Sequence, residues 1–195
     1  MDTLGISKSA RHLAEPDRRG FWPWIADGAD AAYWIYRGGG MVLLMAAFCI
    51  IVSTARGNPA SAAIEASFLI LGAAGIVRCN RIAAAATTLS FVLFVVLMGR
   101  YNPYSLFGLA PVSLAFLHAA RGVWFLNRAG QPLPPLNRNR LLNALAGPLP
   151  KAIWGVGRLD FYAMAAAALP WLVYRIFAPI APGAKWRGVI EFPWM

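Results

Sequence analysis

The amino-acid sequence predicts an all-α fold, a polytopic transmembrane helical bundle. Of its 195 residues, 59% are hydrophobic and only 13% are charged, whereas a soluble domain is about half apolar and about a quarter charged. A soluble core of this size could not hide so much apolar surface, because small folds keep much of their surface in water. The apolar residues also form runs long enough to cross a hydrocarbon core, which is about 30 Å thick.

Residues 1–37 are predicted to form a cytoplasmic and interfacial N-terminal segment. Its second half, 21–37 (FWPWIADGADAAYWIYR), mixes aromatic with acidic residues, which is typical of a short helix at the level of the lipid headgroups. The glycine run 38–40 either lets the chain turn into the bilayer or lets another helix approach closely. Of these two interpretations the turn is favoured. The first charges are followed by no apolar stretch, so a cleavable signal peptide is not expected.

Residues 38–126 are predicted to form a four-helix transmembrane bundle. The first three spans have about 17 to 19 residues, which is about 26 to 29 Å of helix at 1.5 Å per residue. The turn RCNR between the second and third spans is so short that these two helices must be antiparallel neighbours. Pro111 can kink the fourth span. The four spans run over about 38–54, 59–77, 82–98 and 104–125.

The composition changes after the fourth span. Residues 127–160 are rich in Pro, Asn and Arg and are predicted to form a cytoplasmic loop, with a short amphipathic helix around 138–146. Residues 161–195 are predicted to hold a fifth membrane helix over 161–181, followed by a tail. Pro170 and Arg175 interrupt this helix, so an interfacial or re-entrant helix is the alternative.

The basic residues predict the orientation, because cytoplasmic loops carry an excess of Lys and Arg. Thirteen of them fall in the N-terminal segment, in the 78–81 turn and between residues 121 and 158, whereas the loops on the other side hold only Arg56 and Arg100. The N-terminus and the 127–160 loop are therefore expected to face the cytoplasm. Fifteen of the eighteen basic residues are Arg, which together with many Ala and Gly suggests a bacterium and hence its inner membrane. The net charge of +10 follows from this placement, and nucleic acid is not an expected partner.

Aromatic and basic residues near the ends of the spans are predicted to anchor the bundle at the membrane interface. Tryptophan rings collect at the headgroup level, and a long arginine side chain can reach the headgroup phosphates. An arginine at the bilayer centre costs about 2.5 to 3.5 kcal/mol on insertion scales and much less near the edge. The predicted anchors are Trp22, Trp24, Trp34, Arg121 and Trp124.

Two polar residues inside the spans are candidates for function. Glu65 is an acidic residue about two turns into the second span and could carry a proton or bind a cation. It could equally be neutral, or pair with Arg56 or Arg100 from the adjacent loops. His118 is a candidate axial ligand of a haem or a chlorophyll. The only other histidine, His12, lies in the polar tail, so polar contact or interface anchoring is the alternative for His118.

The other polar residues of the spans favour packing over chemistry. Thr87, Thr88 and Ser90, with the alanines before them, form a small-residue face of the kind used in helix packing. Cys49 and Cys79 form no CxxC pair and are predicted to be isolated thiols. The motifs HExxH, GxSxG and the phosphate-binding loop are absent from the sequence. An enzyme is therefore not expected, and no cofactor is specified.

Two stretches carry a resemblance to a known class of proteins. They are RCNRIAAAATTLSFVLF, a basic turn before an Ala-rich third helix, and FLHAARGVWFLNR, which closes the fourth helix. Over about residues 33–128 the chain resembles small, uncharacterised four-helix bacterial inner-membrane proteins. The resemblance implies a four-helix bundle and no activity, and residues 129–195 depart from it.

For function, the sequence favours a non-enzymatic accessory or assembly subunit that packs against a larger bacterial membrane complex. The spans lack catalytic chemistry, both ends are rich in aromatic residues, and the Pro-rich loop suits docking. The expected partners are the lipid bilayer and other membrane protein subunits. The alternatives are a small transporter or proton-coupled carrier using Glu65, and a pigment- or haem-binding subunit using His118.

Overall fold

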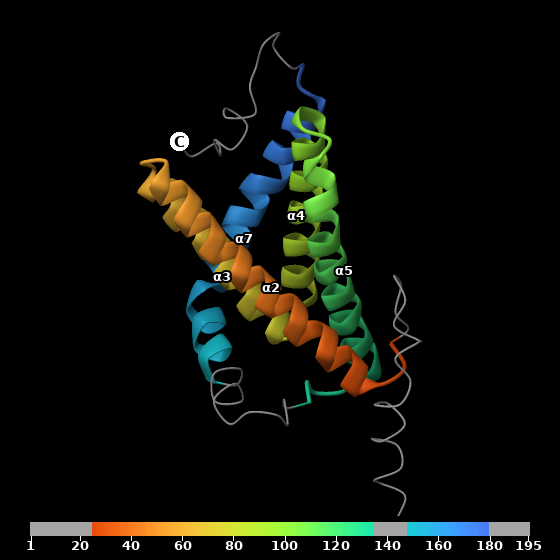
Figure 1. Ribbon diagram of the computed structural model, residues 1–195. Helices are drawn as coiled ribbons and strands as arrows, with labels where there is room; N and C mark the ends of the chain where they lie inside the picture. Colours follow the sequence, from red (N-terminus) through yellow and green to blue (C-terminus); the bar gives the residue numbers. More distant parts are fainter. Residues whose placement is uncertain (1–24, 135–147, 180–195) are drawn as a thin grey trace, which may run out of the picture.

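The computed structural model describes residues 25–134 and 148–179, and within these ranges it contains five helices and no strand (Figure 1). The predicted all-α fold is confirmed. Four of the helices, α2 to α5, are long and apolar enough to cross a membrane, so the chain is a multi-pass membrane protein. The helices are α2 (Gly28–Ala55), α3 (Pro59–Val77), α4 (Arg81–Tyr101), α5 (Ser105–Ala129) and α7 (Pro148–Phe177).

Side-chain caps start the helices after short turns. Asp27 accepts hydrogen bonds from the backbone N–H groups of Ala29 and Asp30, both at 2.9 Å, at the start of α2. Asn58 and Asn80 cap α3 and α4 in the same way. Each cap satisfies backbone donors that the first helical turn leaves open. The chain can therefore reverse direction within a few residues, and α2 to α5 alternate in direction (Figure 1).

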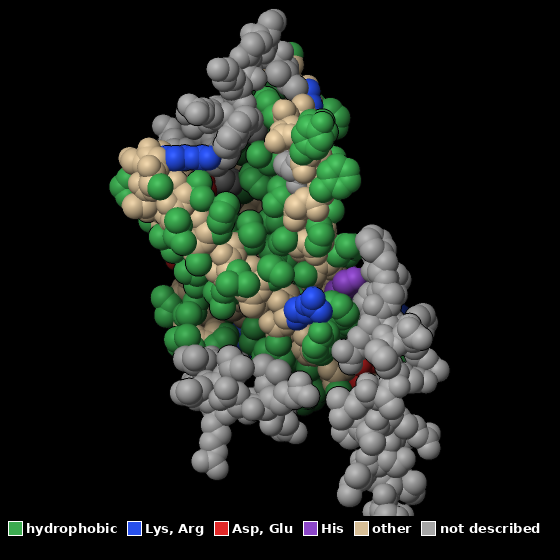
Figure 2. Space-filling view, viewed as in Figure 1, with side chains coloured by type: hydrophobic (Ala, Val, Ile, Leu, Met, Phe, Trp, Pro, Cys, Tyr) green, Lys and Arg blue, Asp and Glu red, His purple; other side chains and the backbone are tan. Residues whose placement is uncertain are grey.

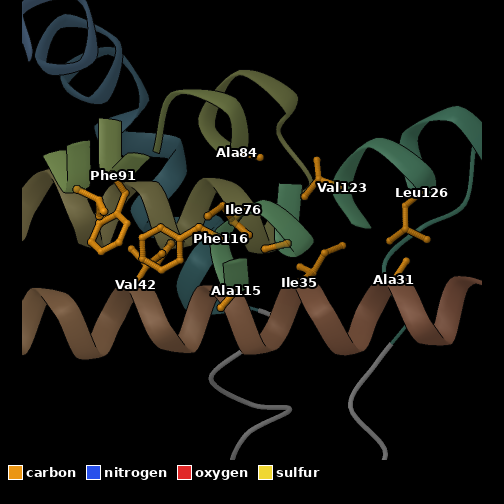
Figure 3. Packing of buried hydrophobic residues seen from close by; sticks show 13 residues of the cluster. Ala31, Ile35, Val42, Ile76, Ala84, Phe91, Ala115, Phe116, Val123 and Leu126 are labelled. Atoms are coloured by element: carbon orange, nitrogen blue, oxygen red, sulfur yellow. The ribbon is translucent and has the colours of Figure 1, made fainter. Parts of the chain in front are cut away.

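The core lies between α2, α3, α4 and α5. Helix α2 packs on α3 and α5, and α4 packs on α5. Figure 3 shows that Val42 of α2 and Ile76 of α3 meet the aromatic rings of Phe91 and Phe116, which come from α4 and α5. The centroids of these two rings are 4.6 Å apart. The antiparallel neighbours predicted from the short 78–81 turn therefore belong to one shared core.

The predicted turn at the glycine run 38–40 is wrong. Helix α2 runs from Gly28 to Ala55 without interruption, so residues 28–37 continue into the first span instead of forming a separate interfacial helix. A Cβ atom at Gly38 would overlap the Cβ of Ala119 on α5, and one at Gly39 would lie 3.0 Å from Val77 on α3. The other interpretation, close approach of a neighbouring helix, is confirmed at Gly38, where only a residue without a side chain fits against Ala119.

Helix α7 begins earlier than predicted. Residues 148–160 belong to the helix and not to the 127–160 loop, while the amphipathic helix expected around 138–146 lies outside the described residues. The helix packs on α3 and α4, and its second half lies along α4. Asn80 Nδ2 donates to Tyr162 Oη at 3.3 Å at one end, and Arg100 donates to backbone carbonyls of α7, including Arg175 O at 3.3 Å, at the other. Helix α7 is not among the four helices that length and hydropathy identify as candidate spans, so the fifth membrane span stays a prediction.

Much of the outer surface is apolar. Figure 2 shows hydrophobic side chains, in green, over much of the face that α2 crosses. Large side chains of α2 project outward, with Leu44 66% and Ile51 68% exposed. In water such a surface would favour aggregation, whereas it matches the acyl chains of a bilayer. The four apolar helices are thus suited to contact with lipid.

Candidate functional site

Glu65 lies inside the bundle and is held by groups from two helices. Its side chain is only 8% exposed. The Ser61 hydroxyl, one turn earlier on α3, donates to Glu65 Oε1 at 3.0 Å, and the Ser53 hydroxyl of α2 donates to Oε2 at 3.4 Å. The Cys49 side chain of α2 also hydrogen-bonds the carboxyl group. A buried carboxyl group needs such partners because burial removes its contacts with water.

Of the two arginines considered as partners of Glu65, one lies near it and the other is engaged elsewhere. Arg56 lines the same cavity as Glu65 at the end of α2, and its side chain is exposed. Arg100 donates to the carbonyl oxygens of Arg175, Ile176 and Ala178 at the end of α7. Two serine hydroxyl groups donate to the carboxylate oxygens, and the charge of Arg56 also acts on the Glu65 carboxyl group.

A cavity of about 360 Å³ lies beside Glu65. This volume is within the range of about 300 to 1,000 Å³ that is common for small-molecule sites. Its wall is largely apolar, with residues from all five described helices. Four phenylalanines line it, together with a few polar side chains. The phenylalanines are Phe48, Phe68, Phe91 and Phe94, and the polar residues include Ser53, Arg56, Glu65, Thr87 and Ser90.

The polar groups of the cavity lie at different depths. We call the end of the bundle at the 56–58 turn the Arg56 end. Glu65 and Gly72 share one face of α3, and the step of seven positions from one to the other corresponds to about 10 Å of helix. A Cβ atom at Gly72 would lie 2.5 Å from Thr87 Oγ1. Thr87 therefore lies about 10 Å further from the Arg56 end than Glu65 does.

Two hydroxyl groups of the cavity wall have no hydrogen-bond partner among the residues that the structure describes. They are Thr87 Oγ1 and Ser90 Oγ, on side chains that are 1% and 6% exposed. Buried hydroxyl groups in proteins almost always have a partner. The neighbouring Thr88 follows this rule, since its hydroxyl donates to Phe116 O at 3.2 Å. The sequence pattern predicted packing for all three residues, whereas two of the three hydroxyl groups line the cavity without a partner among the described residues.

His118 is buried, with 3% of its side chain exposed. Its ring packs against Trp34, with 4.8 Å between the ring centroids, and its Nδ1 lies 3.3 Å from a guanidinium nitrogen of Arg121. His118 is not one of the residues that line the Glu65 cavity. Within residues 25–134 and 148–179, no three His, Cys, Asp or Glu side chains are grouped as a metal site would require. Polar contact at this position is what the geometry shows, and axial ligation stays a prediction.

Three of the predicted interface anchors lie in the half of the bundle opposite the Arg56 end: Trp34, Arg121 and Trp124. The guanidinium group of Arg37 lies 5.4 Å from the centroid of the Trp34 ring. That of Arg81 lies 6.0 Å from the Trp124 ring, which is 49% exposed. Such cation–π pairs place aromatic and basic groups together, as a headgroup region favours. Trp22 and Trp24 lie outside the described residues.

The two cysteines are free thiols, as predicted. Cys79 occupies the turn between α3 and α4 with a positive φ of 53°, and Asn127 Nδ2 donates to its carbonyl oxygen at 2.8 Å. Burial raises the pKa of the Cys79 thiol above its ordinary value. The thiol is therefore protonated at neutral pH and is a poor nucleophile.

Comparison with known proteins adds no functional assignment. The chain matched no family model, no curated protein and no solved structure. The resemblance to small four-helix bacterial membrane proteins stays an expectation.

Proposed function

We propose that this protein is a small membrane carrier in which Glu65 exchanges a proton as the adjacent cavity takes up and releases its cargo. The observation that carries the proposal is a buried carboxyl group on the wall of a cavity of about 360 Å³. An ionisable residue within a membrane span is costly, and it is therefore a functional candidate by default. The cavity beside it supplies the space that a carrier needs.

The groups around Glu65 suit both protonation states. A serine hydroxyl can donate to a carboxylate, and it can also accept a hydrogen bond from a protonated carboxyl group. Ser53 and Ser61 can therefore stay bonded to Glu65 while its proton comes and goes. Arg56 lines the same cavity with an exposed side chain, so the Arg56 end offers a path between Glu65 and water.

The accessory-subunit hypothesis stays a prediction. It requires a surface reserved for another protein, but the exposed apolar side chains of α2 are equally suited to lipid. The excess of basic residues at one end supports an inner-membrane location with the N-terminus in the cytoplasm. In this orientation the Arg56 end faces away from the cytoplasm.

The carrier proposal can be tested with the purified full-length chain in liposomes that contain a pH-sensitive dye. A pH gradient is imposed, and organic cations, organic anions and neutral solutes are added in turn. We expect one class of solute to change the rate of proton movement, and Glu65→Gln to remove the effect. Asp160→Asn is the matched control, because Asp160 is exposed on α7 and should leave the rate unchanged. If no solute changes the rate beyond that of empty liposomes, the carrier proposal is wrong.

A further inference from the structure

We propose that the cargo of the Glu65 cavity is an elongated organic cation. Its charged nitrogen lies at Glu65, its apolar body lies along the phenylalanines, and a hydrogen-bonding group at its far end meets Thr87 and Ser90. This inference rests on the proposed function, because it names the substrate class of the same site. Three features of the cavity carry it: the sign of its charge, its aromatic wall and its two unpartnered hydroxyl groups.

The charge inside the cavity favours a cation. Glu65 is the acidic residue among the described residues that line the cavity, and Arg56 is the basic one. The two are placed differently. Arg56 is exposed at the end of α2, where water screens its charge, whereas Glu65 is only 8% exposed. A charge acts more strongly in a low-dielectric interior, so an occupant beside the ionised Glu65 carboxylate meets a negative site that the charge of Arg56 offsets only in part.

The aromatic wall suits the same occupant. Phe68, Phe91 and Phe94 line the cavity from α3 and α4. The faces of aromatic rings carry negative potential and attract organic cations, including quaternary ammonium groups. The rings also pack against the apolar body of a ligand and exclude water from it. An inorganic cation would leave most of this wall without a contact.

The far end of the cavity requires a polar group. Thr87 Oγ1 and Ser90 Oγ line the cavity, and neither has a partner among the described residues. Each hydroxyl group can donate one hydrogen bond and accept two. Thr87 of α4 lies about 10 Å from Glu65, measured along the axis of α3. This separation sets the distance between the two polar ends of the ligand. A hydroxyl, ether or carbonyl group would serve at this far end.

Cation binding is coupled to a proton in a defined way. When Glu65 holds a proton, binding of a monovalent cation breaks the carboxyl O–H bond, the proton leaves to water, and the carboxylate balances the cation. No electrons are transferred and no other covalent bond changes. The titratable side chains of α2 that face Glu65 are Cys49 and Arg56, and the described cavity-lining residues of α4, α5 and α7 contribute none.

The first test measures binding to the full-length protein in mild detergent by calorimetry. The probe is (8-hydroxyoctyl)trimethylammonium, whose extended chain is about 10 Å long, and the comparison ligands are 1-octanol and octanoate. We expect the cation to bind more tightly than either. In the pH range where Glu65 is protonated, the Kd of the cationic probe should fall about tenfold for each unit of increase in pH, because binding releases one proton. Glu65→Gln should weaken binding at least tenfold and remove the pH dependence.

Two further variants separate this inference from its alternatives. Arg56→Gln should leave cation binding unchanged or strengthen it. If the cavity instead served anions, the wild-type protein would bind octanoate through Arg56, and Arg56→Gln would lose that affinity. The added hydroxyl of the probe should improve its affinity over octyltrimethylammonium. A double variant with Thr87→Val and Ser90→Ala should lose this advantage but still bind both cations. Thermal unfolding of each variant verifies that the bundle is intact, and the pH dependence of the wild-type protein provides a test that needs no variant.

The outcomes distinguish the inference from the proposed function. If the cation binds with the expected pH dependence but no Glu65-dependent proton flux occurs, the inference stands and the carrier function fails. If octanol or octanoate drives a Glu65-dependent flux and the cation does not bind, the carrier function stands and the inference is overturned. Tighter binding of octanoate than of the cation, lost in Arg56→Gln, would also overturn it.

Discussion

Two adjacent threonines should respond in opposite directions to the same substitution. Thr87 and Thr88 follow one another on α4, and both are buried, at 1% and 7% exposure. The Thr88 hydroxyl donates to Phe116 O at 3.2 Å, whereas Thr87 Oγ1 has no partner among the described residues. Valine has nearly the shape of threonine without the hydroxyl. Thr87→Val should therefore stabilise the ligand-free protein, and Thr88→Val should destabilise it.

The expected magnitudes follow from the hydrogen bonds. A buried polar group without a partner costs roughly 1 to 3 kcal/mol, and interhelical hydrogen bonds in membranes contribute about 0.6 kcal/mol on average. Thr87→Val should raise the free energy of unfolding by about 1 kcal/mol. Thr88→Val should lower it by about 0.5 to 1.5 kcal/mol, because it removes an interhelical hydrogen bond to the carbonyl of Phe116.

The assay is reversible unfolding of the purified full-length protein in mixed micelles, with the denaturing detergent fraction at the midpoint as the readout. Comparing the two variants removes effects common to a Thr→Val change on α4. If Thr87→Val lowers the midpoint as much as Thr88→Val does, then Thr87 has a partner within the protein itself. The Thr87 hydroxyl would then not be available to a ligand.

Two further pairs of variants test the packing and the orientation. Gly38→Ala should destabilise the bundle by about 1 to 3 kcal/mol through overpacking against Ala119. Gly40→Ala, with no atom within 4 Å of the new Cβ, should be neutral or stabilising by up to about 1 kcal/mol. Thermal unfolding measures both variants, and equal effects would contradict the close helix approach at Gly38. Gly57→Cys and Gly130→Cys place thiols in open turns at opposite ends, both at positive φ, in a background without the native cysteines. An impermeant thiol reagent added to intact cells should label Gly57→Cys, and it should label Gly130→Cys only after permeabilisation. The reverse pattern would mean that the N-terminus faces outward.

Several features of this protein could be determined from the sequence alone. The runs of apolar residues predicted helices that can cross a membrane, because the need to satisfy backbone groups in lipid leaves few alternatives to a helix. The four residues of the 78–81 turn were enough to make α3 and α4 antiparallel. Glu65 could be singled out because a carboxyl group in an apolar run is costly wherever it lies. Each of these conclusions depends on composition, length or charge along one stretch of chain.

Other features were decided by residues that are distant in the sequence. Glycine permits either a turn or a close helix approach, and Ala119 on the opposite helix decides for the approach at Gly38. Thr87, Thr88 and Ser90 are equivalent as a pattern. Only the position of α5 gives Thr88 a carbonyl partner and leaves the other two hydroxyl groups facing a cavity. Hydropathy belongs to a segment by itself, whereas hydrogen-bond partners and internal space exist only once several helices have packed together.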